Sequence, residues 1–432
     1  MSTMNQLPAK TARPKWHFTP ECNWLNDPNG LFHLDGTWHL FFQHNPLAPT
    51  WGNMSWGHAI STNLLTWTEL DVAIRFREDE GIFSGSVVVD HGNTSGLGNT
   101  SEPPVVALFT SAYSSGLQAQ SLAVSNDLGA TFTRVGDGPV LDRRSSHFRD
   151  PKVVRYVDDA GLSHWIMITV EALDRQVLIH SSNDLMNWTQ ESTFGPLGPE
   201  GAEWECPDLF ELELDGDPSR RRWVMLLSFN PVPEDPHGSS MVYFIGDFDG
   251  HTFIPDDTSR WDRVDHGRDF YAGVTFDNAP GNSRIMIGWM NNWRYGRQTP
   301  TEPWRGAMSL PRQLTLGTID GKPHLLQRPL LPDDPERVHA VDWDATVPHS
   351  MDLLVGERGP AAVLSWEPHT RMLVLDRSVG AGAGFHPDFP SVTRVAMPDR
   401  YDRIHLTVVT DGHLIEVFSD DGAITISEQA FS

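Results

Sequence analysis

Five short polar motifs recur along this chain at a nearly constant spacing, and most of them contain a carboxylate. Their marker residues are Asp27, Ser84, Asp150, Glu205 and Asp269, at steps of about 60 residues. Each motif comes directly before an apolar, strand-like run. A polar motif at the start of an equivalent strand in every repeat predicts that all five lie at one end of a circular array. We expect an active site at that end.

The carboxylates suit the cleavage of a glycosidic bond. Cleavage with retention needs two carboxyl groups roughly 5 Å apart, one acting as nucleophile and the other as acid/base. Glu205 is flanked by tryptophan, cysteine and proline, an apolar setting that favours a protonated carboxyl. Asp27 lies among asparagines and a glycine, and Asp150 follows Arg149, settings that favour the ionised form. Two such opposed environments are expected of an acid and its nucleophile.

Each motif taken alone also fits an ordinary structural role. Residues 26–30, Asn-Asp-Pro-Asn-Gly, can form a tight turn, and Arg149 with Asp150 can form a surface ion pair. Turns need not fall at the same point of every repeat, so the shared position of the motifs favours a common site.

Tryptophans provide a second indication. The chain has 16 of them, and Trp51, Trp56, Trp289 and Trp293 lie in polar segments rich in glycine and asparagine. A flat apolar ring with a polar edge suits the apolar face of a sugar ring. We therefore predict that these four lie near a carbohydrate site.

The motifs are embedded in a repeat typical of β-hairpins. A second set of segments, at residues 61–67, 125–132, 182–188 and 246–253, recurs at the same period. These segments combine an Asx or glycine turn with an aromatic residue that begins the next strand. Repeats of several short strands predict a β-propeller, because radial repetition of small sheets leaves few exposed edges.

The predicted fold class is all-β: a five-bladed β-propeller at residues 1–335, followed by a small C-terminal β-sandwich at residues 336–432. A proline-rich stretch at residues 329–335 marks the boundary. Beyond it the period is lost, and alternating segments between residues 404 and 426 are joined by Asp-Gly turns, which is typical of a β-meander. We expect a structural or substrate-positioning role for this second domain.

Composition narrows the classes of partner. The 432-residue chain carries a formal net charge of −25, so nucleic acid and anionic membrane surfaces are poor partners and a neutral sugar fits better. No histidine cluster coincides with the carboxylates, so no metal site is predicted. Without a visible signal peptide or membrane-length segment, we expect a cytoplasmic protein, or a secreted one if a leader has been removed. The oligomeric state stays open.

Three of the segments resemble the signature blocks of glycoside hydrolase family 32, which comprises invertases, exo-inulinases, levanases and fructosyltransferases. These are residues 24–30, 149–151 and 205–207. Further similar blocks lie at residues 42–46, 51–58, 83–86, 269–272, 304–306, 311–312, 375–377 and 415–418.

The resemblance implies a five-bladed propeller with a β-sandwich, no cofactor, and roles for individual residues. Asp27 would be the nucleophile that forms a fructosyl-enzyme, Glu205 the acid/base, and Asp150 the residue that binds fructose hydroxyls and stabilises the transition state. The substrate-binding positions would be Asn26, Gln43, Trp51, Phe83, Ser84, Arg149, Asp269 and Trp289.

We therefore expect a retaining β-fructosidase that removes terminal, non-reducing β-D-fructofuranosyl units from sucrose and fructans of the levan or inulin type. The alternatives are a fructosyltransferase, which shares the same carboxylates, and a non-catalytic sugar-binding propeller. Linkage and chain-length preference stay open.

Overall fold

The computed structural model describes residues 11–99, 101–198, 200–230, 235 and 237–432. Strands dominate these residues, and the helices described are three short 3-10 turns, η1 (Pro280–Asn282), η2 (Gly296–Gln298) and η3 (Ala383–Phe385). The predicted all-β class is confirmed. No helix of the described part is long and apolar enough to cross a membrane. The prediction about a leader depended on residues 1–14, and residues 1–10 of these lie outside the described residues.

Five inner strands carry the sequence motifs. They are β1 (Asn23–Leu34), β5 (Glu80–Val89), β10 (Phe148–Val157), β14 (Glu203–Leu214) and β19 (Tyr271–Thr275). Each loses register with its antiparallel partner within its motif: between Leu25 and Pro28, Ile82 and Gly85, Arg149 and Lys152, Glu205 and Asp208, and Tyr271 and Val274. Such a bulge bends a strand and redirects its side chains. The repeated motif is thus a repeated bulge.

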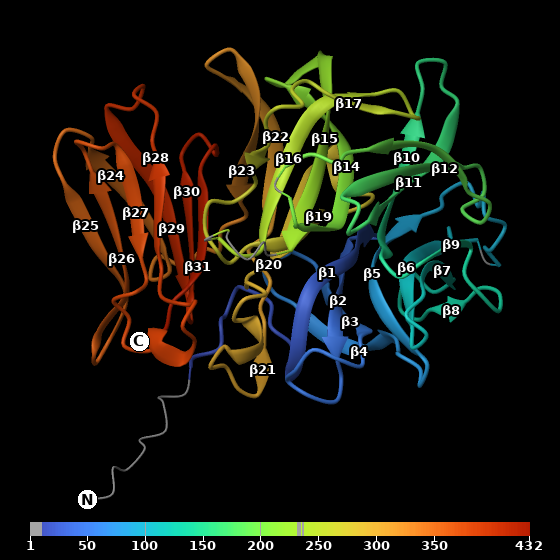
Figure 1. Ribbon diagram of the computed structural model, residues 1–432, viewed down its shortest axis with the longest axis horizontal. Coiled ribbons are helices and arrows are strands. Elements are labelled where there is room, and N and C mark those ends of the chain that lie inside the picture. Colours follow the sequence, from blue (N-terminus) through green and yellow to red (C-terminus); the bar gives the residue numbers. More distant parts are fainter. Residues whose placement is uncertain (1–10, 100, 199, 231–234, 236) are drawn as a thin grey trace, which may run out of the picture.

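The inner strands begin antiparallel sheets that surround a common centre (Figure 1). The first sheet adds β2 (Thr37–Asn45), β3 (Ser55–Ser61), β4 (Thr68–Ile74) and β21 (Trp304–Arg305) to β1. The second adds β6 (Val105–Tyr113), β7 (Gln118–Ser125), β8 (Thr133–Arg134) and β9 (Leu141–Ser145) to β5. The third adds β11 (Ser163–Glu171), β12 (Gln176–Ser182) and β13 (Thr189–Phe194) to β10. The parallel pairing of β21 with β1 joins distant parts of the chain.

The remaining strands of the propeller form one nine-stranded sheet, in which β18 pairs with β16 and β23 pairs with β22 beside the main strand order. One half contains β14, β15 (Asp217–Asn230), β16 (Ser240–Phe248), β17 (Phe253–Pro255) and β18 (Asp262–Arg263). The other half contains β19, β20 (Arg284–Trp289), β22 (Arg312–Ile319) and β23 (Lys322–Pro329). A single parallel pair, Leu214 with Leu316, links the halves.

Equivalent hairpins use equivalent turn chemistry. Asn63 Oδ1 accepts the N–H of Leu65 at 3.0 Å, and Asp184 Oδ1 accepts the N–H of Met186 at 2.9 Å. These are Asx turns, in which a side chain replaces a backbone acceptor. The turn motif read from the sequence therefore forms the same local structure in two repeats.

Two four-stranded sheets pack as a sandwich beside the propeller (Figure 1). One contains β24 (Val338–Asp344), β29 (Arg403–Asp411), β30 (Leu414–Ser419) and β31 (Thr425–Gln429). The other contains β25 (His349–Gly356), β26 (Gly359–Glu367), β27 (Met372–Asp376) and β28 (Val392–Ala396). The predicted meander through Gly412 and Gly422 is present, and both glycines have positive φ, 67° and 75°, which suits a tight turn.

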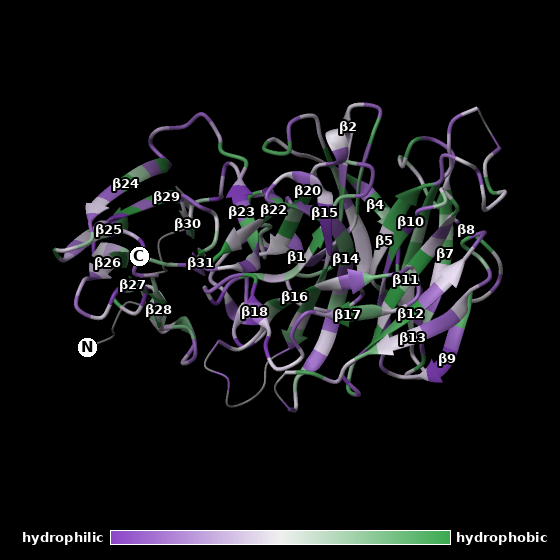
Figure 2. Ribbon diagram, turned by 90° about the horizontal axis from the view of Figure 1, so that it is seen from above, coloured by the Kyte–Doolittle hydropathy of each residue, from purple (hydrophilic) through white to green (hydrophobic). Residues whose placement is uncertain are grey.

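Burial follows the radial order of the strands. Along β6 the first seven residues are buried, as expected for a strand covered on both faces. The outer strands β9 and β13 are mostly exposed and hydrophilic, whereas hydrophobic residues run along β10 and β11 (Figure 2). The core therefore lies between the sheets and holds the inner strands, with their bulges, in fixed positions.

Candidate active site

The three predicted catalytic carboxylates line one cavity of about 160 Å³. Its lining residues are Asn26, Asp27, Gln43, Trp51, Phe83, Ser84, Arg149, Asp150, Glu205, Asn230, Trp293 and Arg297. One water molecule takes about 10–15 Å³ of cavity volume, so this cavity has room for on the order of a dozen water-sized groups. One monosaccharide unit is of this size.

Asp27 lies at the bulge of β1, and only one of its two carboxylate oxygens is hydrogen-bonded by the described residues. Ser84 Oγ donates to Oδ2 at 2.7 Å, and Cys206 Sγ lies 3.7 Å from the same oxygen. No described residue hydrogen-bonds the buried Oδ1. Burial, together with the charge of Glu205, raises the pKa of Asp27 to about 6, although hydrogen bonds from Asn26 and Ser84 lower it. Oδ1 is the atom available to react.

Asp150 lies at the bulge of β10 with a φ of 61°, a conformation uncommon outside glycine. Its N–H donates to Thr110 Oγ1 at 2.9 Å, and its Oδ2 accepts the N–H of Cys206 at 2.9 Å. Cys206 Sγ lies 3.7 Å from Oδ2 of both Asp150 and Asp27. Burial raises the pKa of Asp150 more than the neighbouring Arg149 guanidinium lowers it. The thiol is a small, weakly polar spacer between two carboxylates.

Glu205, at the bulge of β14, is more accessible than Asp150: their side chains are 19% and 6% exposed. Tyr271 OH donates to Oε2 at 2.6 Å, and Asn230 Nδ2 donates to the same oxygen at 3.2 Å. Arg149 donates to Oε1 at 3.1 Å. Three donors from three strands fix this carboxyl while leaving it open to the cavity.

The carboxyl of Glu205 is not in the apolar setting that its sequence neighbours indicated. Trp204 is fully buried and stacks on Phe229 at a centroid distance of 5.9 Å. Successive side chains of a strand point to opposite faces, so Trp204 packs in the core while Glu205 meets polar donors. The apolar environment predicted from flanking residues was wrong for this reason.

Arg149 connects the acidic groups of the site. Its guanidinium lies 2.7 Å from Glu203, 3.1 Å from Glu205 and 4.0 Å from Asp150. Burial alone would lower the pKa of Arg149, but these carboxylates raise it. The charged guanidinium offsets the repulsion among carboxylates and allows several to share one cavity.

Aromatic rings form the rest of the wall. Trp51, 41% exposed, meets Phe83 edge to face with centroids 5.9 Å apart. The Arg297 guanidinium lies 5.8 Å from the Trp51 centroid and 5.9 Å from that of Trp293. Trp293 Nε1 and Gln43 Nε2 have no hydrogen-bond partner among the described residues. Flat rings and open donors together fit a sugar with its hydroxyl groups.

Two residues predicted to bind substrate lie elsewhere. Trp289 is fully buried and packs behind the wall, with centroids 4.8 Å from Trp293 and 5.9 Å from Trp24. Asp269 is fully buried and accepts hydrogen bonds from Tyr295 and from Gln429 of the sandwich. The prediction that Asp269 contacts the substrate was therefore wrong.

The position of the bulge explains this error. The bulges of β14 and β19 begin at Glu205 and Tyr271, so Tyr271 occupies the position equivalent to the acid/base candidate. Asp269 lies two residues too early. The fifth motif therefore contributes a phenol hydroxyl to the site and a carboxylate to the domain interface.

Sequence reasoning missed three further site residues. Asn230 ends β15, opposite Glu203, and carries no motif. Arg297 lies in η2, outside the repeat. Tyr271 lay inside a motif that the sequence had singled out, so aligning the inner strands by their bulges would have found it.

No group of three or more His, Cys, Asp or Glu side chains in the described part of the chain could hold a metal ion. Both cysteines are free; Cys206 is buried and Cys22 is exposed. Burial raises the pKa of the Cys206 thiol well above its usual range.

Known proteins are similar to this chain in sequence and in fold. The chain is 38% identical to a levanase of Bacillus subtilis, over 96% of this chain and 66% of the levanase. It is 35% identical to an extracellular exo-inulinase of Aspergillus ficuum, over 97% of this chain and 89% of that enzyme.

Its fold matches the exo-inulinase of Aspergillus awamori with a TM-score of 0.87 and 34% identity, over 98% of this chain and 93% of the other. It matches a fructofuranosidase of Schwanniomyces occidentalis, complexed with fructose, with a TM-score of 0.86 and 32% identity, over 99% and 94% of the two chains. Residues 17–329 match the glycosyl hydrolases family 32 N-terminal domain, and residues 341–432 match the family 32 C-terminal domain. The chain, a β-propeller with a β-sandwich, belongs to glycosyl hydrolase family 32.

Proposed function

We propose that this protein is a retaining β-fructosidase that hydrolyses terminal, non-reducing β-D-fructofuranosyl units of sucrose and fructans. The observation that carries the proposal is the convergence of Asp27, Asp150 and Glu205 on one cavity of monosaccharide size. Membership of family 32 and the relatives named levanase, exo-inulinase and invertase support it.

In the first chemical step, Asp27 acts as the nucleophile. Its open Oδ1 attacks the anomeric carbon of the fructosyl unit, and the bond to the leaving group breaks. The bonding electron pair stays with the glycosidic oxygen, which takes a proton from the carboxyl of Glu205. The products are a fructosyl ester of Asp27 and the released alcohol of the leaving group.

In the second step, Glu205 acts as the base. It takes a proton from a water molecule, whose oxygen attacks the anomeric carbon, and the ester bond to Asp27 breaks. Asp150 lies beside Asp27, where it binds ring hydroxyls and stabilises the positive charge that develops on the sugar. Two displacements at one carbon retain its configuration.

The shape of the cavity supports removal of one unit at a time. Its walls close around a volume for a single sugar, whereas Trp51 and Arg297 lie at its exposed side. The fructosyl unit fills the cavity, and the leaving group lies against these two rim residues. A chain end is required to enter, which favours exo-attack.

The five-bladed architecture is supported by the packing of the inner strands. β1 contacts β5, β5 contacts β10, β10 contacts β14, β14 contacts β19, and β19 contacts β1. We infer a closed ring of five blades, in which the nine-stranded sheet provides the last two. We place the domain boundary between Pro329, which ends β23, and Val338, which begins β24.

A time course on sucrose, inulin and levan tests the proposal, with products identified by chromatography. We expect free fructose from all three substrates, and no free fructose from Asp27→Ala and Glu205→Ala variants that still fold. Near-normal hydrolysis by either variant would refute the assigned roles.

The same time course at high sucrose separates hydrolysis from transfer, because the two differ only in whether water or a sugar attacks the fructosyl-enzyme. Free fructose equal to the released glucose supports hydrolysis. Fructo-oligosaccharides with little free fructose would identify a fructosyltransferase.

A further inference from the structure

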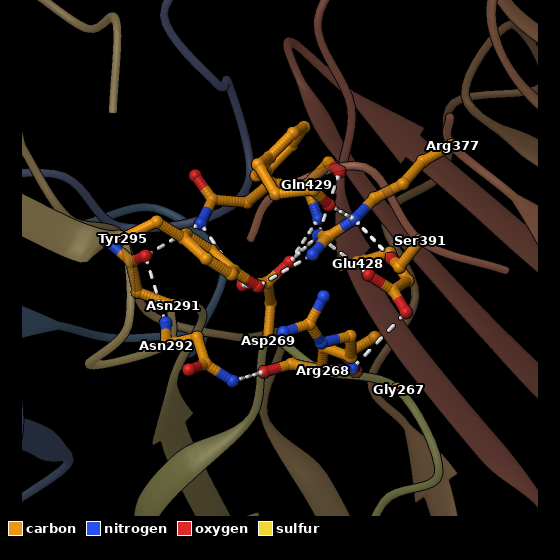
Figure 3. A network of polar contacts seen from close by, with 12 residues as sticks. Gly267, Arg268, Asp269, Asn291, Asn292, Tyr295, Arg377, Ser391, Glu428 and Gln429 are labelled. Atoms are coloured by element: carbon orange, nitrogen blue, oxygen red, sulfur yellow. Dashed lines mark hydrogen bonds and ion pairs between the residues drawn. The ribbon is translucent and has the colours of Figure 1, made fainter. Parts of the chain in front are cut away.

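The interface between propeller and sandwich contains a buried charged cluster (Figure 3). Arg377, which follows β27, is fully buried in it. Its guanidinium forms an ion pair with Asp269 of the propeller, lies 2.7 Å from Glu428 of β31, and donates to Tyr295 OH at 2.7 Å. One sandwich side chain therefore binds two propeller residues at once.

Asp269 is held from both domains. Its carboxylate accepts the hydroxyl of Tyr295 at 2.7 Å and the backbone N–H of Gln429 at 2.7 Å. Its own N–H donates to the carbonyl of Ser427 at 3.1 Å. Figure 3 shows Arg377 and Gln429 reaching Asp269 from the sandwich side. The backbone at Asp269 is thus tied to β31.

Two short segments join this cluster to the cavity. Asp269 precedes Tyr271 by two residues, and Tyr271 OH donates to Glu205 at 2.6 Å. Tyr295 follows Trp293 by two residues, and Trp293 lines the cavity. Extended chain advances about 3.3 Å per residue, so each segment spans at most about 7 Å. The cluster is therefore joined to the acid/base contact and to the aromatic wall by short stretches of backbone.

Another arginine at the same interface has no such link. Arg337, which precedes β24, lies 3.0 Å from Asp411 and 3.4 Å from Asp334. The Asp411 carboxylate in turn accepts the backbone N–H of Trp16, in the segment that precedes the propeller strands, at 2.7 Å. None of these residues lines the cavity or lies within two residues of one that lines it or contacts Glu205. The two arginines share contacts across the interface but differ in their link to the site.

Building on the fructosidase proposed above, we infer that Arg377 is a positioning residue for the reaction. Through Asp269 and Tyr271 it fixes the orientation of Glu205, so the sandwich domain takes part in leaving-group protonation. A buried ion pair is weak evidence for stability, and in some proteins it serves to fix one geometry. The cluster fits that role, since it fixes the strand that presents the donor to Glu205.

The test compares two substrates that differ in their need for an acid. Sucrose needs a proton on its leaving group, whereas p-nitrophenyl β-D-fructofuranoside releases a stable phenolate without one. kcat/KM is measured for both, since it covers every step up to the cleavage. In Arg377→Lys we expect kcat/KM on sucrose to fall about tenfold or more, as positioning losses do, with at most about a twofold fall on the nitrophenyl substrate.

Arg337→Lys is the control, and thermal melting checks that both variants are folded. We expect the ratio of the two kcat/KM values to stay at the wild-type level in Arg337→Lys. Equal losses on both substrates in Arg377→Lys, or the same change of ratio in Arg337→Lys, would show a general effect of the interface and overturn the inference.

Asp269→Asn tests the same link if Arg377→Lys does not fold, because the amide keeps an acceptor for Tyr295 but removes the charge that Arg377 binds. We expect the same selective loss on sucrose. Tyr271→Phe should show it too, and Arg377→Lys combined with Tyr271→Phe should add little, because both changes act on Glu205. Additive effects would refute the route through Tyr271. Inactivity of the wild-type protein on both substrates would instead refute the proposed function.

Discussion

Replacing Asp27 with asparagine is expected to abolish activity and, above about pH 6, to stabilise the fold. Asp27 is 9% exposed, and burial with the nearby charge of Glu205 raises its pKa to about 6 from the ordinary 3.8. The ionised carboxylate of Asp27 therefore destabilises the folded protein relative to its protonated form, although the reaction requires it. An amide keeps an oxygen that can accept the Ser84 hydroxyl and carries no charge.

The size of the effect follows from the two pKa values. The protonated carboxyl contributes stability that is fully present below about pH 3.8 and is lost as the pH rises through about 6. A shift of roughly two units corresponds to at most about 3 kcal/mol. An unfolding entropy of about 2.1 cal/mol/K per residue gives about 0.9 kcal/mol/K for this chain, so the melting midpoint should move by about 3 °C.

Melting midpoints of the wild type and Asp27→Asn are measured by calorimetry at pH 4 and pH 7.5. The midpoint of the variant relative to the wild type should rise by about 3 °C between these pH values, because costs of the substitution that do not depend on pH cancel. Asp35→Asn, in an exposed turn, is the control and should show no such rise. If the melting midpoints of the variant and the wild type differ by the same amount at both pH values, Asp27 carries no buried, destabilising charge.

Three further predictions follow from the site. First, kcat/KM on sucrose should fall as the pH falls through about 6, because protonated Asp27 cannot attack. Ser84→Ala removes a hydrogen bond that favours the ionised form, so this acidic limb of the pH profile should move to higher pH. An acidic limb at the wild-type pH in Ser84→Ala would contradict the assignment. Second, Trp51→Ala should lower kcat/KM on sucrose about 2- to 10-fold, mainly through KM, as expected for one lost ring contact; an unchanged KM would place the sugar elsewhere. Third, Gly30→Ala should sharply lower the melting midpoint, since Gly30 has a φ of 50° and an added Cβ would lie 2.8–2.9 Å from Val87, Phe41 and Trp56; replacement of Gly36, which has open space around it, is the control, and equal losses would exclude crowding as the cause.

The sequence predicted the features that repeat. The period of the motifs, the hairpin turns and the strand-like runs indicated an all-β propeller. The resemblance of the ordered motif blocks indicated family 32, which the comparisons confirm. The gathering of Asp27, Asp150 and Glu205 was predictable, because equivalent strands of a circular repeat begin at the same end.

Only the tertiary structure determined which way the side chains point and which groups of different sheets meet. Asp269 shares the spacing of the other motifs, yet the bulge of β19 begins two residues later and presents Tyr271 instead. Trp289 and Trp293 lie in one polar segment, but only Trp293 lines the cavity. Which residue of a motif faces the site depends on where the strand bends, and no local pattern records that position.

The contribution of the sandwich domain to the site was also determined by the tertiary structure. Arg377 lies more than a hundred residues after Asp269 along the chain, yet it contacts that carboxylate in the buried interface. Spacing and composition encode elements that repeat locally, so the sequence determined the strands and the chemistry they carry. Contacts between distant segments depend on how complete sheets pack, so the structure determined which of those groups meet.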